Sequence, residues 1–367
     1  MLKLLLYPIS WLYGIVVFLR NRAYDLDILK SHEFEVPIIS IGNITVGGTG
    51  KTPHVEYLIE LLKNKYKVAT LSRGYKRKTK GFRLVELDST VAEAGDEPLQ
   101  IKNKFPEVTV SVSEDRVMGV EHLLQQNSTD VPDVILLDDA FQHRRITPGI
   151  NILLIDYNRQ IKDDHLLPYG RLREGRYQSR RANIVIFSKC PDEVTPIMRR
   201  ILQNDIHLLP YQKLYFTKLE YGKLVPAFGA KRLGKVFYEE CKYTILLVTG
   251  IASPKLMYNY LKEFTDHIEI LTFPDHYDYR EADILKIENR FEAMQAEKKI
   301  IVTTEKDVMR LRNIELVEKL KTSIYYLPVK VRFLEEEKKS FNKRIFNYVG
   351  ENKSNRELYK RKNSGKA

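Results

Sequence analysis

The 367-residue sequence is poor in cysteine and in long apolar runs, and each shortage narrows the class of protein. Its two cysteines, Cys190 and Cys241, lack the spacing of a metal site and make a poor disulfide framework, so a reducing compartment is the simpler interpretation. We find no internal repeat of solenoid length and no helix-turn-helix, zinc-finger or RNP-like pattern. Hydrophobic residues still make up 43% of the chain, which is enough for a sizeable core. The sequence therefore predicts a folded protein whose length suits two lobes.

Positive charge is the main excess, with 60 lysines and arginines against 48 acidic residues and a formal net charge of +12. A basic balance of this size suits an anionic partner, which includes nucleic acid, a phospholipid surface or a phosphorylated substrate. Because no nucleic-acid-binding motif accompanies the charge, we expect no nucleic-acid partner. The sequence leaves the oligomeric state open.

The longest apolar run lies at the start of the sequence. Residues Leu4 to Leu19 carry no charge and are flanked by Lys3 and Arg20. Spanning a bilayer takes roughly 20 apolar residues, so the run is slightly short, while its aromatic rings and basic flanks suit the cytoplasmic membrane surface. No small-residue cleavage site of a signal peptide is evident. We expect a membrane-associated helix, with a tilted span and a buried core helix as alternatives, and a soluble remainder.

Short apolar runs alternate with helix-like segments along the rest of the chain. Several runs are continuously apolar, which is typical of parallel strands that are covered on both faces. The pattern predicts a doubly wound, mostly parallel α/β fold in two lobes. The expected strands are 36–43, 67–72, 107–112, 133–139, 150–156, 182–188, 244–250, 268–273, 299–304 and 324–329. The expected divisions are the helix 1–24, a core lobe 25–208, an antiparallel connecting segment 209–241, a second α/β lobe 242–349 and a mobile basic tail 350–367.

The stretch "VPIISIGNITVGGTGKTPHVEYLIELL", residues 36–62, lacks one glycine of a phosphate-binding loop. In the pattern G-x-x-x-x-G-K-[ST], Thr45 stands where the first glycine belongs, while Gly50, Lys51 and Thr52 are in place. The context is still strand–loop–helix, and this arrangement turns backbone N–H groups toward an anion. A strand followed by a plain glycine turn is the alternative. We expect Lys51 to contact the terminal phosphates of a nucleotide and Thr52 to bind Mg²⁺. The nucleotide-binding residues are expected to be Thr45, Val46, Gly47, Gly48, Thr49, Gly50, Lys51 and Thr52.

Two adjacent aspartates, Asp138 and Asp139, end the apolar run of "VPDVILLDDAFQHRR". Burying two neighbouring carboxylates without a cation is costly, so a divalent ion is expected beside them. A helix cap or a turn is the alternative for such a pair taken alone. The sequence does not tell which aspartate binds the ion.

Seven motifs occur in order: "GNITVGGTGKTP", "SRGYKRK", "GDEP", "DDAFQHR", "LLPYGRLRE", "FPDHYDY" and "TTEKD". Over roughly residues 1 to 330 the sequence closely resembles the tetraacyldisaccharide 4′-kinases of lipid A biosynthesis, which also lack the first loop glycine. The resemblance implies a P-loop NTPase-like fold. It also implies that the γ-phosphoryl group of ATP is transferred to the 4′-hydroxyl of an acylated glucosamine disaccharide 1-phosphate, giving lipid IV-A at the cytoplasmic face of the bacterial inner membrane. The alternative function is a membrane-attached NTPase switch or chaperone without a sugar-lipid acceptor.

The resemblance also implies roles for single residues. Asp96 in "GDEP" corresponds to the family's catalytic base, His276 in "FPDHYDY" to its partner, and Lys51 to the loop lysine. A helix cap and a solvated loop are the structural alternatives for Asp96 and His276. Glu97 and Glu174 are weaker metal candidates, each of which could pair with an arginine instead. Candidates for binding the acceptor are Arg73, Arg116, Gln142, His143 and Arg171. Adenine-binding residues stay open, although "TTEKD" ends a strand and is expected near the base.

Overall fold

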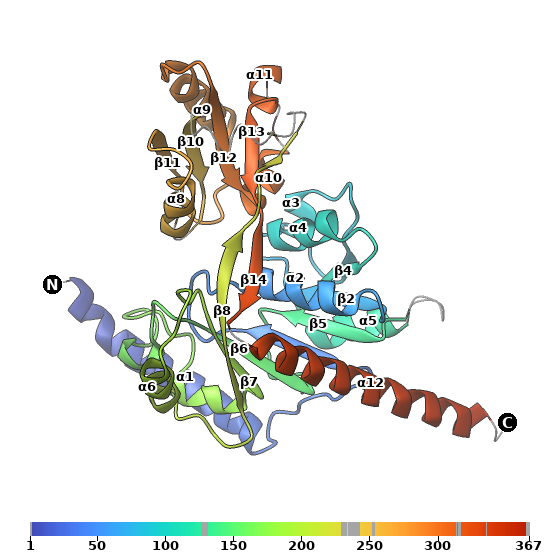
Figure 1. Cartoon of the computed structure of the whole chain (residues 1–367). Helices are drawn as coiled ribbons and strands as arrows, with labels where there is room; N and C mark the ends of the chain where they lie inside the picture. Colours follow the sequence, from blue (N-terminus) through green and yellow to red (C-terminus); the bar gives the residue numbers. More distant parts are fainter. Residues whose placement is uncertain are drawn as a thin grey trace.

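The computed structural model describes residues 2–364 except 126–130, 229–232, 234–242, 252–253, 313, 315–316 and 335. Within these residues the strands form two sheets, one in each of two lobes stacked end to end (Figure 1). The larger sheet has the order β14-β8-β7-β6-β1-β5-β2-β4-β3, and the smaller one β11-β10-β12-β13-β9. All neighbours are parallel except β3 with β4, β14 with β8 and β9 with β13. The predicted doubly wound, mostly parallel α/β fold is confirmed.

The first lobe is built on strands that are buried from end to end. Its strands are β1 (Ile38–Gly42), β2 (Val68–Ser72), β3 (Arg83–Leu84), β4 (Thr109–Val112), β5 (Val134–Asp138), β6 (Ile150–Asp156), β7 (Ile184–Ser188), β8 (Lys213–Tyr221) and β14 (Val329–Phe333). Every residue of β1, β5, β6 and β7 is buried, which explains why their sequences are continuously apolar rather than alternating. The helices of this lobe are α1 (Leu2–Asp25), α2 (Lys51–Leu62), α3 (Val91–Ala94), α4 (Asp96–Lys104), α5 (Arg116–Leu124), α6 (Pro196–Asp205) and α12 (Glu337–Ser364), with 3₁₀ turns at Ile161–Asp163 and Arg176–Arg181.

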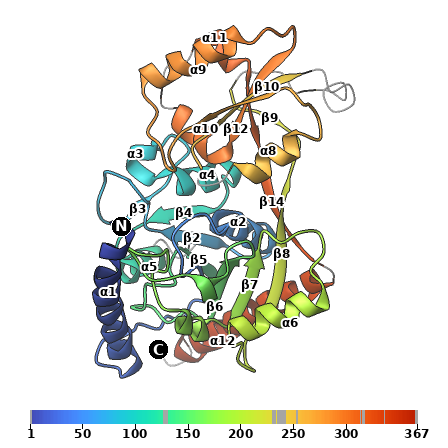
Figure 2. The same ribbon diagram turned by 90° about the vertical axis from the view of Figure 1, so that its left-hand side faces the viewer.

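The second lobe is a smaller sheet with helices beside it (Figure 2). Its strands are β9 (Val225–Pro226), β10 (Thr244–Thr249), β11 (Ile268–Thr272), β12 (Lys299–Thr304) and β13 (Ile324–Leu327). Its helices are α8 (Lys255–Leu261), α9 (Glu281–Ala293), α10 (Glu305–Leu311) and α11 (Glu318–Lys321). Each strand expected from the apolar runs corresponds to a strand of one of the two sheets.

Two long strands carry the chain between the lobes. β8 leaves the first lobe and β14 returns to it, paired antiparallel from Val329 with Tyr221 to Phe333 with Thr217. The segment expected as an antiparallel connection, 209–241, thus contributes β8, which also pairs in parallel with β7. Its residues 229–232 and 234–241 lie outside the described part.

The last part of the chain lies in a different lobe from the one that the sequence predicts. Residues 329–349, which the sequence groups with the second lobe, lie against the first. Phe341 of α12 is buried beside Tyr57, and Tyr348 bonds to the backbone of Ile38. Helix α12 continues through residues 350–364 of the segment expected to be mobile.

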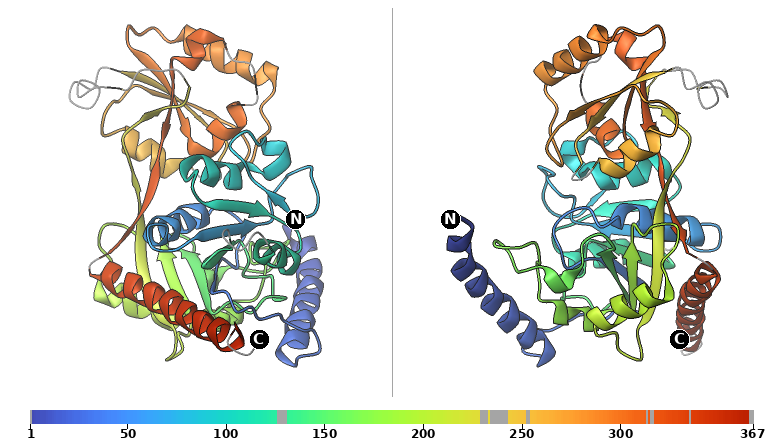
Figure 3. Two further views of the ribbon diagram at one scale, coloured as in Figure 1. Left: turned by 90° about the vertical axis from the view of Figure 1, so that its right-hand side faces the viewer. Right: turned by 60° about the vertical axis from the view of Figure 1, so that its left-hand side comes forward.

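Helix α1 lies along one side of the first lobe and points away from it at the N-terminus (Figure 3). One side of the helix is tied to loops by polar groups: Ser10 donates to the carbonyl of Leu166 at 2.7 Å and Tyr13 to that of Arg173 at 2.8 Å. The opposite side is apolar and exposed, with Trp11 at 69% of its full accessibility. Among the described residues, no helix combines the length and hydropathy needed to cross a membrane. The expected association of this helix with a membrane is not confirmed by the fold.

A buried histidine fixes the start of α2 against β8. His54 donates from Nδ1 to the carbonyl of Gly50 at 2.7 Å, and its Nε2 accepts from the Thr217 hydroxyl at 3.0 Å. The bond in which Nε2 accepts requires the neutral imidazole. Because burial disfavours the charged form, the pKa of His54 is lowered to about 4.

We predict that His54 makes the free energy of unfolding depend on pH. Between about pH 6.5 and 4 the unfolded chain binds a proton that the folded chain does not, so His54 lowers stability as the pH falls. The free energy of unfolding of a His54→Gln variant, which keeps a donor and an acceptor, should have a pH slope that differs from the wild-type slope by up to about 1.4 kcal/mol per pH unit. Urea unfolding from pH 4.5 to 7.5 measures both slopes. Equal slopes would contradict this role.

Candidate active site

The glycine loop has the geometry of an anion-binding turn. Gly47 and Gly50 have φ angles of 105° and 84°, which side-chain-bearing residues rarely adopt. Gly50 is followed directly by α2, so the first backbone N–H groups of the helix face the loop. Pro53 occupies the first turn of α2, where its missing N–H costs no hydrogen bond. The turn is therefore suited to phosphate groups.

Bonds from two other segments hold this loop in place. The N–H of Val46 donates to the carbonyl of Arg171 at 2.8 Å, and Thr45 forms an isolated bridge with Leu172. Ser188 donates to the carbonyl of Thr49 at 2.7 Å. A threonine in place of the first glycine is thus accommodated by the loop 165–174, which lies beside it.

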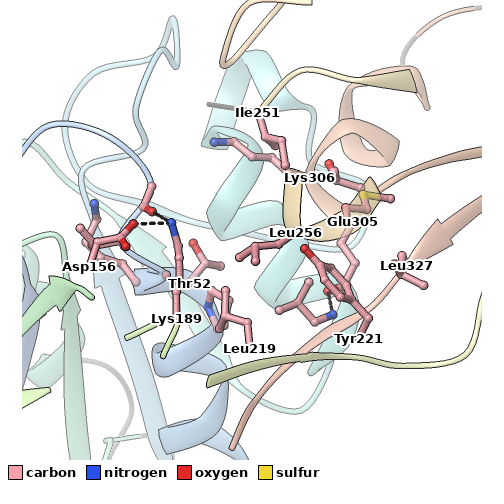
Figure 4. Close-up of a pocket in the computed structure, with 18 of the residues that line it drawn as sticks. Thr52, Asp156, Lys189, Leu219, Tyr221, Ile251, Leu256, Glu305, Lys306 and Leu327 are labelled. Atoms are coloured by element: carbon pink, nitrogen blue, oxygen red, sulfur yellow. Dashed lines mark hydrogen bonds and ion pairs between the residues drawn. The ribbon is translucent and has the colours of Figure 1, made fainter. Parts of the chain in front are cut away.

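A cavity of about 470 Å³ opens in front of the glycine loop and reaches the second lobe (Figure 4). Thr52 and Lys189 lie on its first-lobe side, and Glu305 and Lys306 on its second-lobe side. Apolar side chains complete the lining: Leu219, Tyr221, Ile251, Leu256, Met257, Leu327 and Val329. The charged loop at one end suits the phosphate groups of a nucleoside triphosphate, and the apolar walls at the other end suit its base.

The two adjacent aspartates have different surroundings. Asp139 lies 3.6 Å from the Lys51 ammonium and accepts from Arg173 at 3.1 Å. Burial opposes ionisation, but Lys51 and Arg173 outweigh it and lower the pKa of Asp139. Asp138 has no such cation in contact, and its buried Oδ1 has no hydrogen-bond partner. Burial, Glu97 and Asp139 together raise the pKa of Asp138 to about 7.

This contrast bears on metal binding. An unpartnered buried carboxylate oxygen next to a second carboxylate, Glu97, has the chemistry of a divalent-cation site. Among the described residues no three His, Cys, Asp or Glu side chains form a ready-made cluster. That suits Mg²⁺, which in nucleotide sites takes few protein ligands and completes its shell with phosphate and water.

Asp96 and His276 meet across the lobe boundary. Asp96 begins α4 of the first lobe, and His276 lies in the loop after β11 of the second. Nδ1 of His276 lies 3.1 Å from Oδ2 of Asp96, and Arg310 donates to the same oxygen from Nε at 3.0 Å and from Nη2 at 2.8 Å. Burial favours the protonated acid, but the bond from His276 and the charges of Lys306 and Arg310 outweigh it and hold the pKa of Asp96 well below its usual value. The pair is therefore a buried carboxylate and the imidazole that it orients.

The proposed metal ligand Glu174 lies in a different environment. Its carboxylate accepts from Arg181, from Asn21 at 3.0 Å and from Gln142 at 3.3 Å. Gln142 also donates to the carbonyl of Asn43 at 2.8 Å. These contacts connect α1 to the end of β1. Glu174 thus pairs with an arginine, which is the alternative that the sequence left open.

The other acceptor candidates differ in burial. Arg116 is buried and close enough to Asp138 and Asp139 for their charges to act on it, while burial lowers its pKa to about 10. Arg73 and Arg171 are exposed. His143 is partly buried, and burial and Arg116 lower its pKa to about 4, so its ring is neutral at physiological pH.

Several residues of the site had no clear signal in the sequence. Lys189 donates to the carbonyl of Gly48 and, at 2.8 Å, to Asp156, which ends β6. The motif "SKCPD" contains this lysine, but its aspartate is spaced one residue too far for the guanine-specific pattern. Arg310 lies only three residues beyond "TTEKD" and had no pattern of its own. The expectation that "TTEKD" lies near the nucleotide fits the position of Thr304, Glu305 and Lys306 in the cavity lining.

Comparison with known proteins agrees with this geometry. A family model described as tetraacyldisaccharide-1-P 4′-kinase matches residues 2–349. The tetraacyldisaccharide 4′-kinase of Phocaeicola vulgatus is 51% identical over 351 residues, covering 95% of this chain and 96% of that protein. The one of Bacteroides thetaiotaomicron is 47% identical over 367 residues, covering 98% and 96%. The crystal structure of LpxK from Aquifex aeolicus in complex with ATP has a TM-score of 0.73 at 33% identity and covers 95% of this chain and 100% of that one.

The family is one of ATP-dependent phosphotransferases, as the motifs imply, and this does not favour the alternative of an NTPase switch. The match extends from the N-terminal helix through both lobes to α12. The chain therefore belongs to the tetraacyldisaccharide-1-P 4′-kinase family.

Proposed function

We propose that the enzyme transfers the γ-phosphoryl group of ATP to the 4′-hydroxyl of a tetraacyldisaccharide 1-phosphate, with the Asp96–His276 pair as the proton acceptor. One observation carries the proposal. A buried carboxylate–imidazole pair lies at the lobe boundary, where Glu97 and Lys306 belong both to its surroundings and to the lining of the nucleotide cavity. A switch that only binds nucleotide has no need of such a pair.

The transfer is a single displacement at phosphorus. The 4′-oxygen forms a bond to the γ-phosphorus as the bond from this phosphorus to the β,γ-bridging oxygen breaks, and the electron pair leaves on ADP. The hydroxyl proton passes to the hydrogen-bonded Asp96–His276 pair. Lys51, oriented by Asp139, contacts the phosphates from the glycine loop.

Mg²⁺ would be held by Thr52, Asp138 and Glu97. The carboxylate of Asp139 is instead paired with the side chains of Lys51 and Arg173. The ion, when bound, neutralises charge on the β- and γ-phosphates. The unpartnered oxygen of Asp138 supports this division between the neighbouring aspartates. We assign Glu174 no metal role.

We further propose that α1 brings the enzyme to the cytoplasmic face of the inner membrane. Its exposed apolar residues include Tyr7, Trp11, Leu12, Phe18 and Leu19, and Leu26 and Ile28 continue this surface beyond the helix. A contiguous apolar surface with basic flanks suits the headgroup boundary of anionic lipids. A lipid-borne acceptor could then reach the site without leaving the membrane surface.

The function is tested by following label from γ-labelled ATP in the presence of the acyl disaccharide 1-phosphate. Wild-type enzyme should place label on the lipid, and Asp96→Asn should lower kcat by roughly 10²–10⁴-fold with ATP affinity nearly unchanged, because the proton acceptor is lost and the glycine loop is not. Label found only in free phosphate would overturn the kinase assignment. Near-normal transfer by the variant would remove Asp96 from the mechanism.

The metal assignment predicts a difference between the two aspartates. Asp138→Asn should raise the Mg²⁺ concentration for half-maximal rate by roughly tenfold or more, because an amide is a weaker ligand than a carboxylate. Asp139→Asn should leave this concentration within about threefold and lower kcat instead, because Lys51 loses its partner. Titrating Mg²⁺ at fixed ATP measures both values. The reverse pattern would show that Asp139 binds the ion.

Membrane binding can be measured by tryptophan fluorescence without an added label, because Trp11 is the only tryptophan in the sequence. Anionic phospholipid vesicles should shift its emission to shorter wavelength and carry the protein into the pellet. The double variant Leu12→Asp/Phe18→Asp should stay in the supernatant, whereas Leu285→Asp, at an exposed position of α9, should sediment like wild type. Unchanged emission together with unchanged sedimentation of the double variant would place the attachment elsewhere.

A further inference from the structure

Lys306 belongs to the motif "TTEKD", for which the sequence predicts a position near the nucleotide but no catalytic role. It lies in the first turn of α10, on the second-lobe side of the nucleotide cavity, across from Thr52 and Lys189 (Figure 4). Its ammonium lies 2.8 Å from Nε2 of His276 and 3.5 Å from Oε1 of Glu97. The side chain is 16% exposed. Lys306 is thus a largely buried cation in contact with both the proton-accepting pair and a proposed metal ligand.

The bonding of His276 shows that Lys306 acts as a donor there. The Lys306 ammonium has donors only, so Nε2 of His276 accepts from it through its lone pair, while Nδ1 donates to the carboxylate of Asp96. Its ammonium lies 3.5 Å from carboxylate oxygens of both Glu97 and Asp275 and 3.9 Å from one of Asp96. Three carboxylates therefore surround this cation.

The other cations of the cavity lining are placed differently. Lys51 belongs to the glycine loop and is held by Asp139, and Lys189 is bound to Asp156 and to the loop carbonyl of Gly48. Arg159 lies beside Gly47, and Lys255 begins α8. Of the described residues that line the cavity, Lys306 is the cation that also contacts the Asp96–His276 pair. The accepting hydroxyl must touch both this pair and the γ-phosphorus, so a cation in contact with the pair is within reach of the transferred group.

We propose that Lys306 is a catalytic residue of the phosphoryl transfer: its ammonium leaves Nε2 of His276 and binds the γ-phosphoryl oxygens from the side opposite the glycine loop. The inference rests on the proposed kinase function. Lys306 forms no covalent bond and loses no proton. It offsets the charge on the phosphoryl oxygens while the bond to the 4′-oxygen forms and the bond to ADP breaks, and it frees the Nε2 lone pair. The second lobe would thereby supply a charge that the glycine loop cannot provide from its own side.

The test separates contact with the transferred group from a purely structural role. Lys306→Met keeps the length of the stem without the charge, and should lower kcat by roughly 10²–10³-fold while the Kd for ATP changes by less than about threefold. Binding of ADP with aluminium fluoride, a mimic of the transferring group, should weaken by at least about tenfold in calorimetry. Lys319→Met, an exposed lysine of α11 in the same lobe, is the matched control and should behave as wild type in each measurement.

Restoring the charge gives a second readout. Alkylating Lys306→Cys with 2-bromoethylamine rebuilds an ammonium of nearly the same length, and should recover transfer that the untreated variant lacks; wild type treated alike controls for Cys190 and Cys241. The inference is overturned if Lys306→Met transfers phosphate at near wild-type rate, if it binds the aluminium fluoride complex normally, or if alkylation restores nothing. Absence of transfer to the lipid by wild type would instead overturn the proposed function.

Discussion

Asp96, a buried carboxylate, connects the two lobes at the proposed site of phosphoryl transfer. It belongs to the first turn of α4 in the first lobe, while its partners His276 and Arg310 come from the second. Removing one partner of a buried ion pair is costly because the remaining charge stays unpaired, so this contact couples the relative position of the lobes to the state of the site. The nucleotide cavity lies between the same lobes, and nucleotide binding and alignment of the proton acceptor therefore depend on one interface.

The surrounding fold places opposite charges on the two sides of that interface. The glycine loop, α2 and the aspartates after β5 belong to one continuous parallel sheet, whose buried strands β1 and β5 are direct neighbours. Their carboxyl ends meet at one edge, which is where open α/β sheets bind ligands. The second lobe supplies His276, Lys306 and Arg310 from the loop after β11 and from α10. The paired strands β8 and β14 connect the first lobe, with the glycine loop and the aspartates, to the second lobe, with His276, Lys306 and Arg310.

Much of this was predictable from local sequence. Continuous apolar runs predicted each central strand, because parallel strands covered on both faces leave few positions for polar residues. The glycine loop was recognisable despite Thr45, since the strand before it and the helix after it supply the geometry. Long-range pairing was not predictable: neither the return of β14 to the first lobe nor the contact of Glu174 with Asn21 has a local pattern. For the same reason the sequence did not predict that Lys306 of "TTEKD" and Arg310 lie beside Asp96.

The central claim is that Asp96 and His276 act as one unit across the lobe boundary. A double-mutant cycle in kcat, with Asp96→Asn, His276→Ala and the combined variant, measures this most directly. If the residues form one proton-accepting pair, the combined variant should be little slower than the slower single variant. Rate losses that multiply would show that the two residues act independently and would contradict the account.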